Sequence, residues 1–181
     1  MAHEIETKVL DIDSGDLIAK LTKLGAKRTK ETRLIVDWFG PKGLTHAGDD
    51  PWFLRIRQNS EGKREVTWKA KSEILGTARK HKEINFNIEE SEKLADLFEE
   101  FGLELYGHQE KDRISFVLKD WVFDIDQYPK MPAYLEIEGS SEEHVKEAIV
   151  LLGLSKNKTW AKGERTLIND IYGLDWFHMK F

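Results

Sequence analysis

The sequence contains no cysteine in its 181 residues, and this absence excludes several kinds of chemistry. Without cysteine the chain forms no disulfides, holds no zinc ion through thiolates and has no cysteine nucleophile. Proline is scarce, with 4 residues, and no apolar run approaches the length that crosses a membrane. The chain begins with charged residues instead of the apolar core of a signal peptide, so we expect a cytoplasmic protein without a membrane partner.

The composition is that of a globular protein. Charged residues make up 34% of the sequence and apolar residues 40%, whereas disordered chains have fewer apolar residues. A single domain over residues 1–181 is the simplest organisation, because the length does not require two and no repeat or linker divides the chain. The net charge of −5 argues against a protein dedicated to nucleic acid.

Hydrophobic periodicity divides the chain into strands and a few amphipathic helices. Alternating patterns predict strands over residues 3–10, 27–39, 52–58, 63–71, 81–88, 103–119, 121–127 and 133–139. Helical spacing predicts a helix that Asp13 or Ser14 caps and Gly25 ends, and further helices over residues 90–101, 141–152 and 162–172. Breaker-rich residues 40–51 and residues 72–80 predict loops.

Charged residues recur at a spacing of two on the predicted strands. Glu4, Glu6 and Lys8 share one face of the first strand, because strand side chains alternate between faces. The same spacing separates Arg55 and Arg57, Lys69 and Lys71, Lys111 and Arg113, Asp124 and Asp126, and Glu136 and Glu138. One such pair alone is most often a solvated strand face. Together they indicate a sheet with one charged face and one apolar face that the helices can cover.

The charged face is either open to water or the lining of a barrel, since eight antiparallel strands are enough to close around a small ligand. In a closed barrel these charges would be buried, and buried charges need partners of opposite sign. A polyphosphate accepts hydrogen bonds from arginine and lysine, and carboxylates can hold Mg²⁺ or Mn²⁺ that bridge to phosphates. The mixture of charges therefore points to a metal ion together with a phosphate chain.

In their order along the chain these residues resemble the CYTH family, also called triphosphate tunnel metalloenzymes. Its amino-terminal Glu-x-Glu-x-Lys is matched by Glu4, Glu6 and Lys8. The later matches are Arg55 and Arg57, Lys69 and Lys71, Glu83, Lys111 and Arg113, Asp126, and Glu136 and Glu138. The resemblance covers nearly the whole chain. It implies an α+β fold, in which amphipathic helices pack outside a closed or nearly closed eight-stranded antiparallel barrel that forms a tunnel.

The resemblance also implies roles for the matched residues. It assigns the binding of Mg²⁺ or Mn²⁺ to Glu4, Glu6, Glu83, Asp126, Glu136 and Glu138. It assigns the binding of a triphosphate to Lys8, Arg55, Arg57, Lys69, Lys71, Lys111 and Arg113. Lys8, Lys111 and Arg113 are also given catalytic roles, in a reaction that depends on placement and charge neutralisation.

The family includes class IV adenylate cyclases and inorganic and thiamine triphosphatases. Residues 124–138 and the Tyr172-Gly173 tail are more similar to bacterial sequences grouped with the cyclases, so the expected reaction converts ATP to cyclic AMP and pyrophosphate. Hydrolysis of inorganic or thiamine triphosphate is the alternative. An alternative to both enzymes is a non-catalytic module that binds polyphosphate or RNA. Residues 64–82 favour it, because they are rich in lysine and arginine around Trp68. The sequence does not decide between a monomer and a homodimer.

Overall fold

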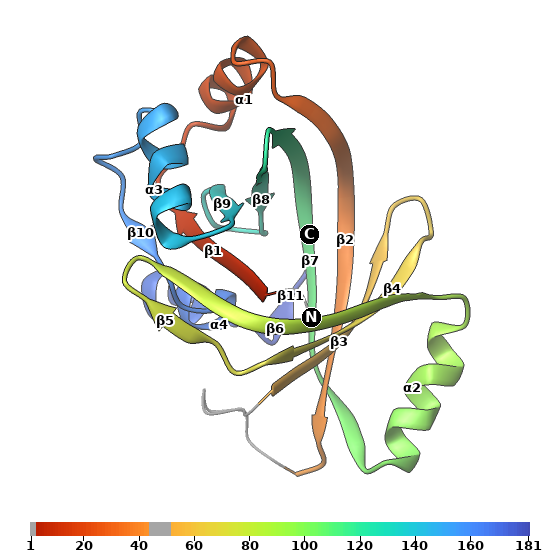
Figure 1. Cartoon of the computed structure of the whole chain (residues 1–181). Helices are drawn as coiled ribbons and strands as arrows, with labels where there is room; N and C mark the ends of the chain where they lie inside the picture. The colour runs from red at the N-terminus through yellow and green to blue at the C-terminus, as the bar shows by residue number, and fades with distance from the viewer. Residues whose placement is uncertain (1–2, 44–51) are drawn as a thin grey trace.

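The computed structural model describes residues 3–43 and 52–181, and the side chains of residues 3 and 4 lie outside that description. In the described part of the chain, eight strands form a closed antiparallel barrel in the order β1, β9, β8, β7, β2, β3, β4 and β6, and β6 pairs with β1 to close the ring (Figure 1). The strands are β1 (His3–Val9), β2 (Lys27–Pro41), β3 (Trp52–Asn59), β4 (Arg64–Ala70), β6 (Ala78–Ile88), β7 (Leu103–Leu118), β8 (Trp121–Gln127) and β9 (Tyr134–Gly139). The predicted barrel and its α+β class are confirmed.

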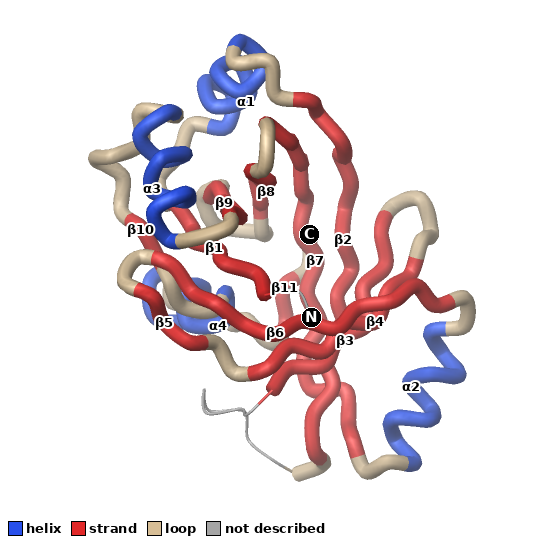
Figure 2. The backbone as a smooth tube through the Cα atoms, viewed as in Figure 1, coloured by secondary structure: helices blue, strands red, loops and turns tan. Residues whose placement is uncertain are grey.

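The three longer helices lie outside the ring of strands, as Figure 2 shows, whereas the start of a fourth, short helix lines the cavity of the barrel. The helices are α1 (Ser14–Lys23), α2 (Ser91–Glu100), α3 (Glu142–Leu151) and the short α4 (Glu164–Thr166), which continues as a π-helical turn, η1 (Leu167–Ile171). The predicted cap of α1 is confirmed, because the Asp13 side chain accepts a hydrogen bond from the Asp16 backbone N–H at 2.9 Å. Gly25 follows the helix at a φ of 80°, which glycine adopts at little cost.

Three local predictions need comment. The prediction of a loop over residues 72–80 is wrong, because this segment contains the strand β5 (Glu73–Leu75) and the start of β6. Residues 44–51 of the other predicted loop lie outside the described residues. Two short strands had no signal in the sequence: β10 (Thr159–Trp160) extends the edge of β1, and β11 (His178–Met179) runs parallel to β7 at His108 and Gln109.

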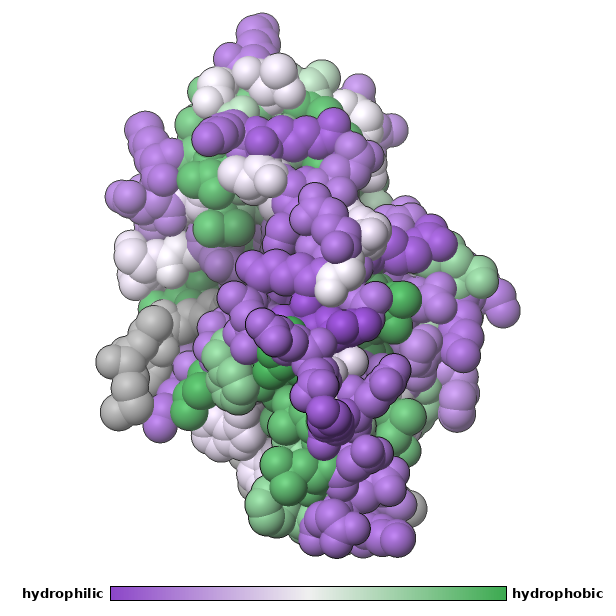
Figure 3. All heavy atoms as spheres, turned by 90° about the vertical axis from the view of Figure 1, so that its right-hand side faces the viewer, coloured by the Kyte–Doolittle hydropathy of each residue, from purple (hydrophilic) through white to green (hydrophobic). Residues whose placement is uncertain are grey.

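Apolar residues form three clusters, two between the outer barrel wall and the helices and one at an end of the cavity. One cluster joins β1, β8 and β9 to α1 and α3 through residues such as Phe123, Leu135 and Ile137, all 0% exposed. A second cluster holds α2 on β3 and β4, and a third joins η1 and the carboxy-terminal tail to the barrel. The surface on the side that carries α2 is mostly hydrophilic, with small apolar patches between charged residues (Figure 3). Within the described residues, the helices are too short or too polar to span a membrane.

Candidate active site

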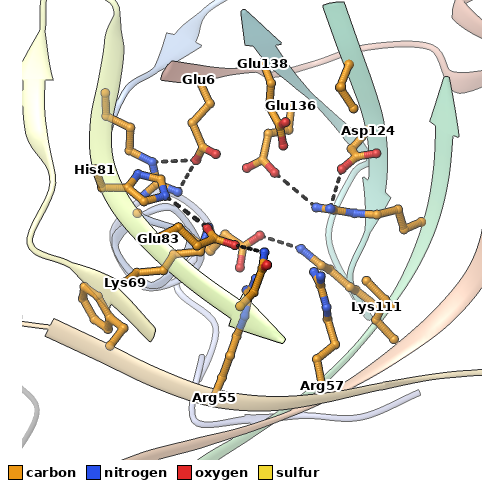
Figure 4. A pocket seen from close by; sticks show the side chains of 18 of the residues that line it. Glu6, Arg55, Arg57, Lys69, His81, Glu83, Lys111, Asp124, Glu136 and Glu138 are labelled. Carbon is orange, nitrogen blue, oxygen red and sulfur yellow. Dashed lines mark hydrogen bonds and ion pairs between the residues drawn. The ribbon is translucent and has the colours of Figure 1, made fainter. Parts of the chain in front are cut away.

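The barrel encloses a cavity of about 530 Å³ whose lining is dominated by charged side chains. They come from all eight strands of the barrel and from the start of α4. The strands bring them together because their inward positions alternate with outward apolar ones, as the spacing of two predicted. Figure 4 shows the carboxylates of Glu6, Glu136 and Glu138 on one side of this cavity and most of the labelled cationic groups on the other, with Glu83 among the latter.

We call Glu6, Glu136 and Glu138 the acidic wall. The register of β1 against β9 pairs Glu6 with Glu138 and Lys8 with Glu136, which brings these carboxylates together from distant parts of the chain. One carboxylate oxygen from each lies within 4.8 Å of the others. Carboxylate oxygens are the ligands that Mg²⁺ and Mn²⁺ prefer, so these three residues fit a divalent cation.

Two cations contact the acidic wall: Lys8, which is buried, and Arg79, which lines the cavity. Lys8 is 0% exposed, and its Nζ lies 3.3 Å from Glu6 Oε1 and 2.7 Å from Glu136 Oε2. Arg79 donates from Nε to Glu6 Oε1 at 2.7 Å. Burial acts to raise the pKa of Glu6, but Arg79 and Lys8 outweigh it and lower that pKa to about 2. Glu6 is therefore ionised at neutral pH.

Arg113 is held by carboxylates of β8 and β9. Its Nε donates to Asp126 Oδ1 at 2.6 Å, its Nη1 pairs with Asp124, and its Nη2 lies 3.2 Å from Glu136 Oε1. Burial acts to lower the pKa of Arg113, but these carboxylates hold it well above the ordinary value. The remaining Asp126 oxygen accepts from Lys111 at 2.7 Å. Asp126, a predicted metal ligand, is thus 0% exposed and bonded to two cations below the cavity surface.

We call Arg55, Arg57, Lys69 and Lys111 the basic wall; Figure 4 places these side chains opposite the carboxylates. Arg55 is 9% exposed, and its buried Nε has no hydrogen-bond partner among the described residues. Arg57 Nη2 lies 2.7 Å from Glu65 Oε1, and Lys69 Nζ lies 2.5 Å from Glu83 Oε2. Because arginine and lysine donate to phosphate oxygens, this wall suits an anionic ligand.

The sequence analysis missed several charged residues of the site, among them Glu164 and Arg79. Glu164 accepts from Lys111 at 2.6 Å and from the hydroxyls of Tyr128 and Tyr134, each at 2.9 Å. The predicted helix over residues 162–172 is present as α4 and η1, but its pattern did not indicate that Glu164 faces the cavity. Arg79 falls in the segment that was predicted as a loop, although its spacing of two from His81 on β6 was a usable signal.

The other predicted site residues have mixed outcomes. Glu83 lines the cavity but lies against Lys69, away from the acidic wall. Lys71 is exposed and follows the last residue of β4, Ala70. The backbone of Glu4 belongs to β1, and its side chain lies outside the described residues.

Aromatic residues close one end of the cavity. Trp38 and Trp176 have ring centroids 5.2 Å apart, and Trp38 and Phe53 meet edge to face at 6.2 Å. Gln109 fixes the tail by donating to the Trp176 carbonyl oxygen at 2.6 Å. The indole N–H of Trp176 is buried and has no acceptor among the described residues, and Arg55 lies over the Trp38 ring at 5.5 Å.

A model of the CYTH domain matches residues 2–163. The chain belongs to the CYTH family. Enzymes of this family process triphosphates and generally use divalent metals. Glu164 follows the last matched residue, so the carboxy-terminal wall of the cavity lies beyond the matched region.

Solved structures from several organisms share the CYTH fold. The PH1012 protein of Pyrococcus horikoshii OT3 is 24% identical, with a TM-score of 0.71 over 86% of this chain and 94% of that one. A candidate adenylate cyclase of Vibrio parahaemolyticus is 13% identical, with a TM-score of 0.75 over 91% and 97%. HpAC1 of Hippeastrum, a candidate adenylyl cyclase whose name reports a dominant triphosphatase activity, is 16% identical, with a TM-score of 0.64 over 99% and 100%. At these identities the likeness shows the fold alone. A search of curated proteins finds no match.

Proposed function

We propose that this CYTH protein is a divalent-metal-dependent enzyme that converts ATP to cyclic AMP and pyrophosphate, as class IV adenylate cyclases do. The observation that carries the proposal is the opposition of the acidic wall and the basic wall across one cavity (Figure 4). A purely basic cavity would suit a phosphate alone. The added carboxylate cluster supplies the oxygen ligands of a metal ion at the same place.

Glu6, Glu136 and Glu138 are the residues that would hold Mg²⁺ or Mn²⁺. When bound there, the ion would neutralise phosphate charge and lower the pKa of the attacking ribose hydroxyl. Glu4 is a further candidate ligand on sequence alone. Lys8 and Arg113 position this set, because each contacts Glu136 from a buried site. We infer that both residues place the carboxylates, and that Arg113, which also lines the cavity, can contact the substrate.

The basic wall would bind the triphosphate. Arg55 and Arg57 present guanidinium groups that can each take two phosphate oxygens, and Lys69 and Lys111 add ammonium groups beside them. Holding the chain of phosphates in one orientation is the main contribution to catalysis, because little covalent chemistry is asked of the protein. The cations would also stabilise the negative charge that develops on the leaving pyrophosphate.

The aromatic end of the cavity favours a nucleoside triphosphate over inorganic tripolyphosphate. Trp38, Phe53 and Trp176 offer apolar ring surface that a bare phosphate chain does not need. The buried N–H groups of Trp176 and Arg55 that have no acceptor among the described residues suit the oxygen and nitrogen atoms of an organic group. Hydrolysis of the terminal phosphate is the alternative, since HpAC1, which has this fold, carries a triphosphatase activity in its name.

The test is to incubate the pure protein with ATP, tripolyphosphate or thiamine triphosphate, each with Mg²⁺ or Mn²⁺, and to identify the products. Cyclic AMP with pyrophosphate from ATP is the expected result. Orthophosphate from any of the three would support the triphosphatase alternative. No turnover would favour a non-catalytic module that binds polyphosphate or RNA.

Glu6→Gln separates the enzyme from such a module. The substitution removes one carboxylate of the acidic wall and leaves the basic wall intact, so turnover should fall by at least about 100-fold while triphosphate still binds. Isothermal titration with a non-hydrolysable ATP analogue measures the binding. A module that only binds would be independent of metal and would lose little when Glu6 is replaced, and its affinity would fall steeply with salt.

A further inference from the structure

Strand β6 has an edge without a partner strand in the described part of the chain. On one side, residues Glu83–Ile88 of β6 pair with β4. On the other side β1 reaches only from Arg79 to Lys82. Residues 83–88 therefore present backbone N–H and C=O groups that do not pair with any described strand, and Glu83, whose side chain lines the cavity, carries the only charge among them. Figure 1 shows β6 crossing the front of the barrel toward α2.

This edge lacks the features that usually protect a sheet edge. Natural edge strands carry charged residues, proline or a bulge that prevents pairing with another chain. Residues 84–88 read Ile-Asn-Phe-Asn-Ile, without a charge or a proline. The side chain of Ile84 is 48% exposed and that of Phe86 is 57% exposed. Such an edge is suited to accept a further strand through main-chain hydrogen bonds.

The apolar rows of the outer face also end at this edge. Ile56, Val66 and Phe86 lie side by side on β3, β4 and β6. The first two are buried at 5% and 3% exposure in the cluster beneath α2, whereas Phe86 is exposed. A second row runs from Trp68 to Ile84 in the same way. A strand added to the edge would continue both rows and cover their exposed ends.

We propose that the added strand is β6 of a second copy of this chain, paired antiparallel about a two-fold axis at Phe86. In this register Phe86 faces its own copy on the outer face, and Ile84 faces Ile88 on either side of it. Asn85 faces Asn87 on the inner face. Opposed residues of two strands related by such an axis lie on the same face, so apolar residues meet apolar ones and amides meet amides.

The charges at the two ends of the edge favour the same arrangement. Lys82 precedes the free residues, and Glu89 and Glu90 follow them. Antiparallel pairing about Phe86 brings the basic end of the edge in each copy near the acidic end in the other, beyond the paired residues, whereas parallel pairing would place like charges together. The chain is thus complementary to itself along this edge. Asn85 also lines the cavity, so the interface would lie at its rim.

Charge substitutions at Phe86 test the two-fold axis. We expect the natural chain to sediment with twice its 21.1 kDa mass. Phe86→Lys and Phe86→Glu each place like charges opposite one another, so each variant alone should dissociate, with a dissociation constant raised about tenfold or more. An equimolar mixture should dimerise again, because opposite charges then meet, and this recovery shows that both variants are folded. Phe101→Lys, at a residue of 73% exposure next to α2, is the control that should stay dimeric.

The absence of cysteine gives a second test of the register. Phe86→Cys places the two new thiols directly opposite, within the Cα separation that a disulfide spans, and mild oxidation should cross-link the dimer. Ile84→Cys on the same face separates the thiols by four residues and should not cross-link. The proposal is overturned if the natural chain is a monomer at about 100 µM, well above the Kd of specific dimers. A dimer that survives both Phe86 charge variants, or that Ile84→Cys cross-links and Phe86→Cys does not, would overturn it as well.

Discussion

The two walls of the cavity differ in how their charges are balanced. On the acidic wall, Glu6 and Glu136 each contact a buried cation of the protein, Lys8, so part of their charge is compensated within the fold. On the basic wall, Arg55 retains a buried Nε without an acceptor among the described residues. The difference teaches that Lys8 contributes to the stability of the barrel, whereas Arg55 has a donor that a bound ligand could use. Substitutions of Lys8 and of Arg55 should therefore have opposite effects on stability.

The largest effect is expected from Lys8→Met. This change removes the ammonium that lies between Glu6 and Glu136 and leaves two buried carboxylates facing each other. Breaking a buried pair in this way costs about 3–5 kcal/mol of unfolding free energy. Urea unfolding followed by circular dichroism measures it. The control is Lys146→Met, which removes an ion pair with Glu142 on a lysine that is 50% exposed, and it should change stability little.

Arg55→Met should do the reverse on the basic wall. Because the guanidinium has a donor without an acceptor among the described residues, its removal should leave the unfolding free energy unchanged or slightly higher. Binding of a triphosphate should weaken by about 10- to 100-fold, since a charge-assisted contact is lost. Titration calorimetry measures the affinity for triphosphate, and urea unfolding of the same sample measures the unfolding free energy. Loss of stability without loss of binding would show that Arg55 belongs to the fold and not to the ligand site.

Lowering the pH should gradually reduce the stability that the ionised carboxylates of the acidic wall give to the fold. Glu6 has a pKa of about 2 in the folded protein against an ordinary 4.5, and Glu136 is also held well below its ordinary pKa. A carboxyl whose pKa is lowered on folding stabilises the fold above its unfolded pKa, and this contribution is lost as the pH falls from about 4.5 toward 2. Asp124 opposes this trend, because burial raises its pKa.

Urea midpoints between pH 7 and pH 3 measure this loss. The expected effect is smaller than that of Lys8→Met, because pH 3 covers only part of the interval. The comparison variant is Glu6→Gln, which should give a flatter decline below pH 4.5 than the natural chain. An identical slope in both proteins would mean that Glu6 does not contribute.

The smallest effect is expected at Glu164, which places a carboxylate on the basic wall. Its oxygen lies 2.6 Å from Lys111 Nζ and would repel a phosphate at that position. Glu164→Gln removes the charge and keeps one oxygen that can accept from Lys111 and Tyr134, while an amide NH2 replaces the oxygen that accepts from Tyr128. Triphosphate should then bind a few-fold more tightly. Weaker binding would instead show that the carboxylate is needed to hold Lys111 in place.

The barrel and the walls could be predicted because one rule governs both. A strand with charges at every second residue places them on one face, and the pairing of β1 with β9 and of β7 with β8 then brings those faces together. The cap of α1 at Asp13 and its end before Gly25 follow from equally local rules.

The same rule could not predict how far a charged side chain lies below the cavity surface, or which residue of opposite charge it pairs with. Alternation assigned Asp126 to the inner face, but its bonds to Lys111 and Arg113 show that it lies beneath the cavity as their counter-ion. Lys71 was predicted to face the cavity but is not among the lining residues, because β4 ends one residue earlier, at Ala70. The helix that carries Glu164 was predicted, but its place at the cavity depends on tertiary packing, which the periodicity of the sequence does not show.

The most direct test of the account is a crystal structure of the protein with Mn²⁺ and a non-hydrolysable ATP analogue, with the ion located by its anomalous scattering. We predict an ion coordinated by Glu6, Glu136 and Glu138, and phosphate oxygens within hydrogen-bond distance of Arg55, Arg57 and Lys69. An ion bound elsewhere, or an analogue that lies outside the barrel, would contradict the claim that the two walls bind a metal and a triphosphate together.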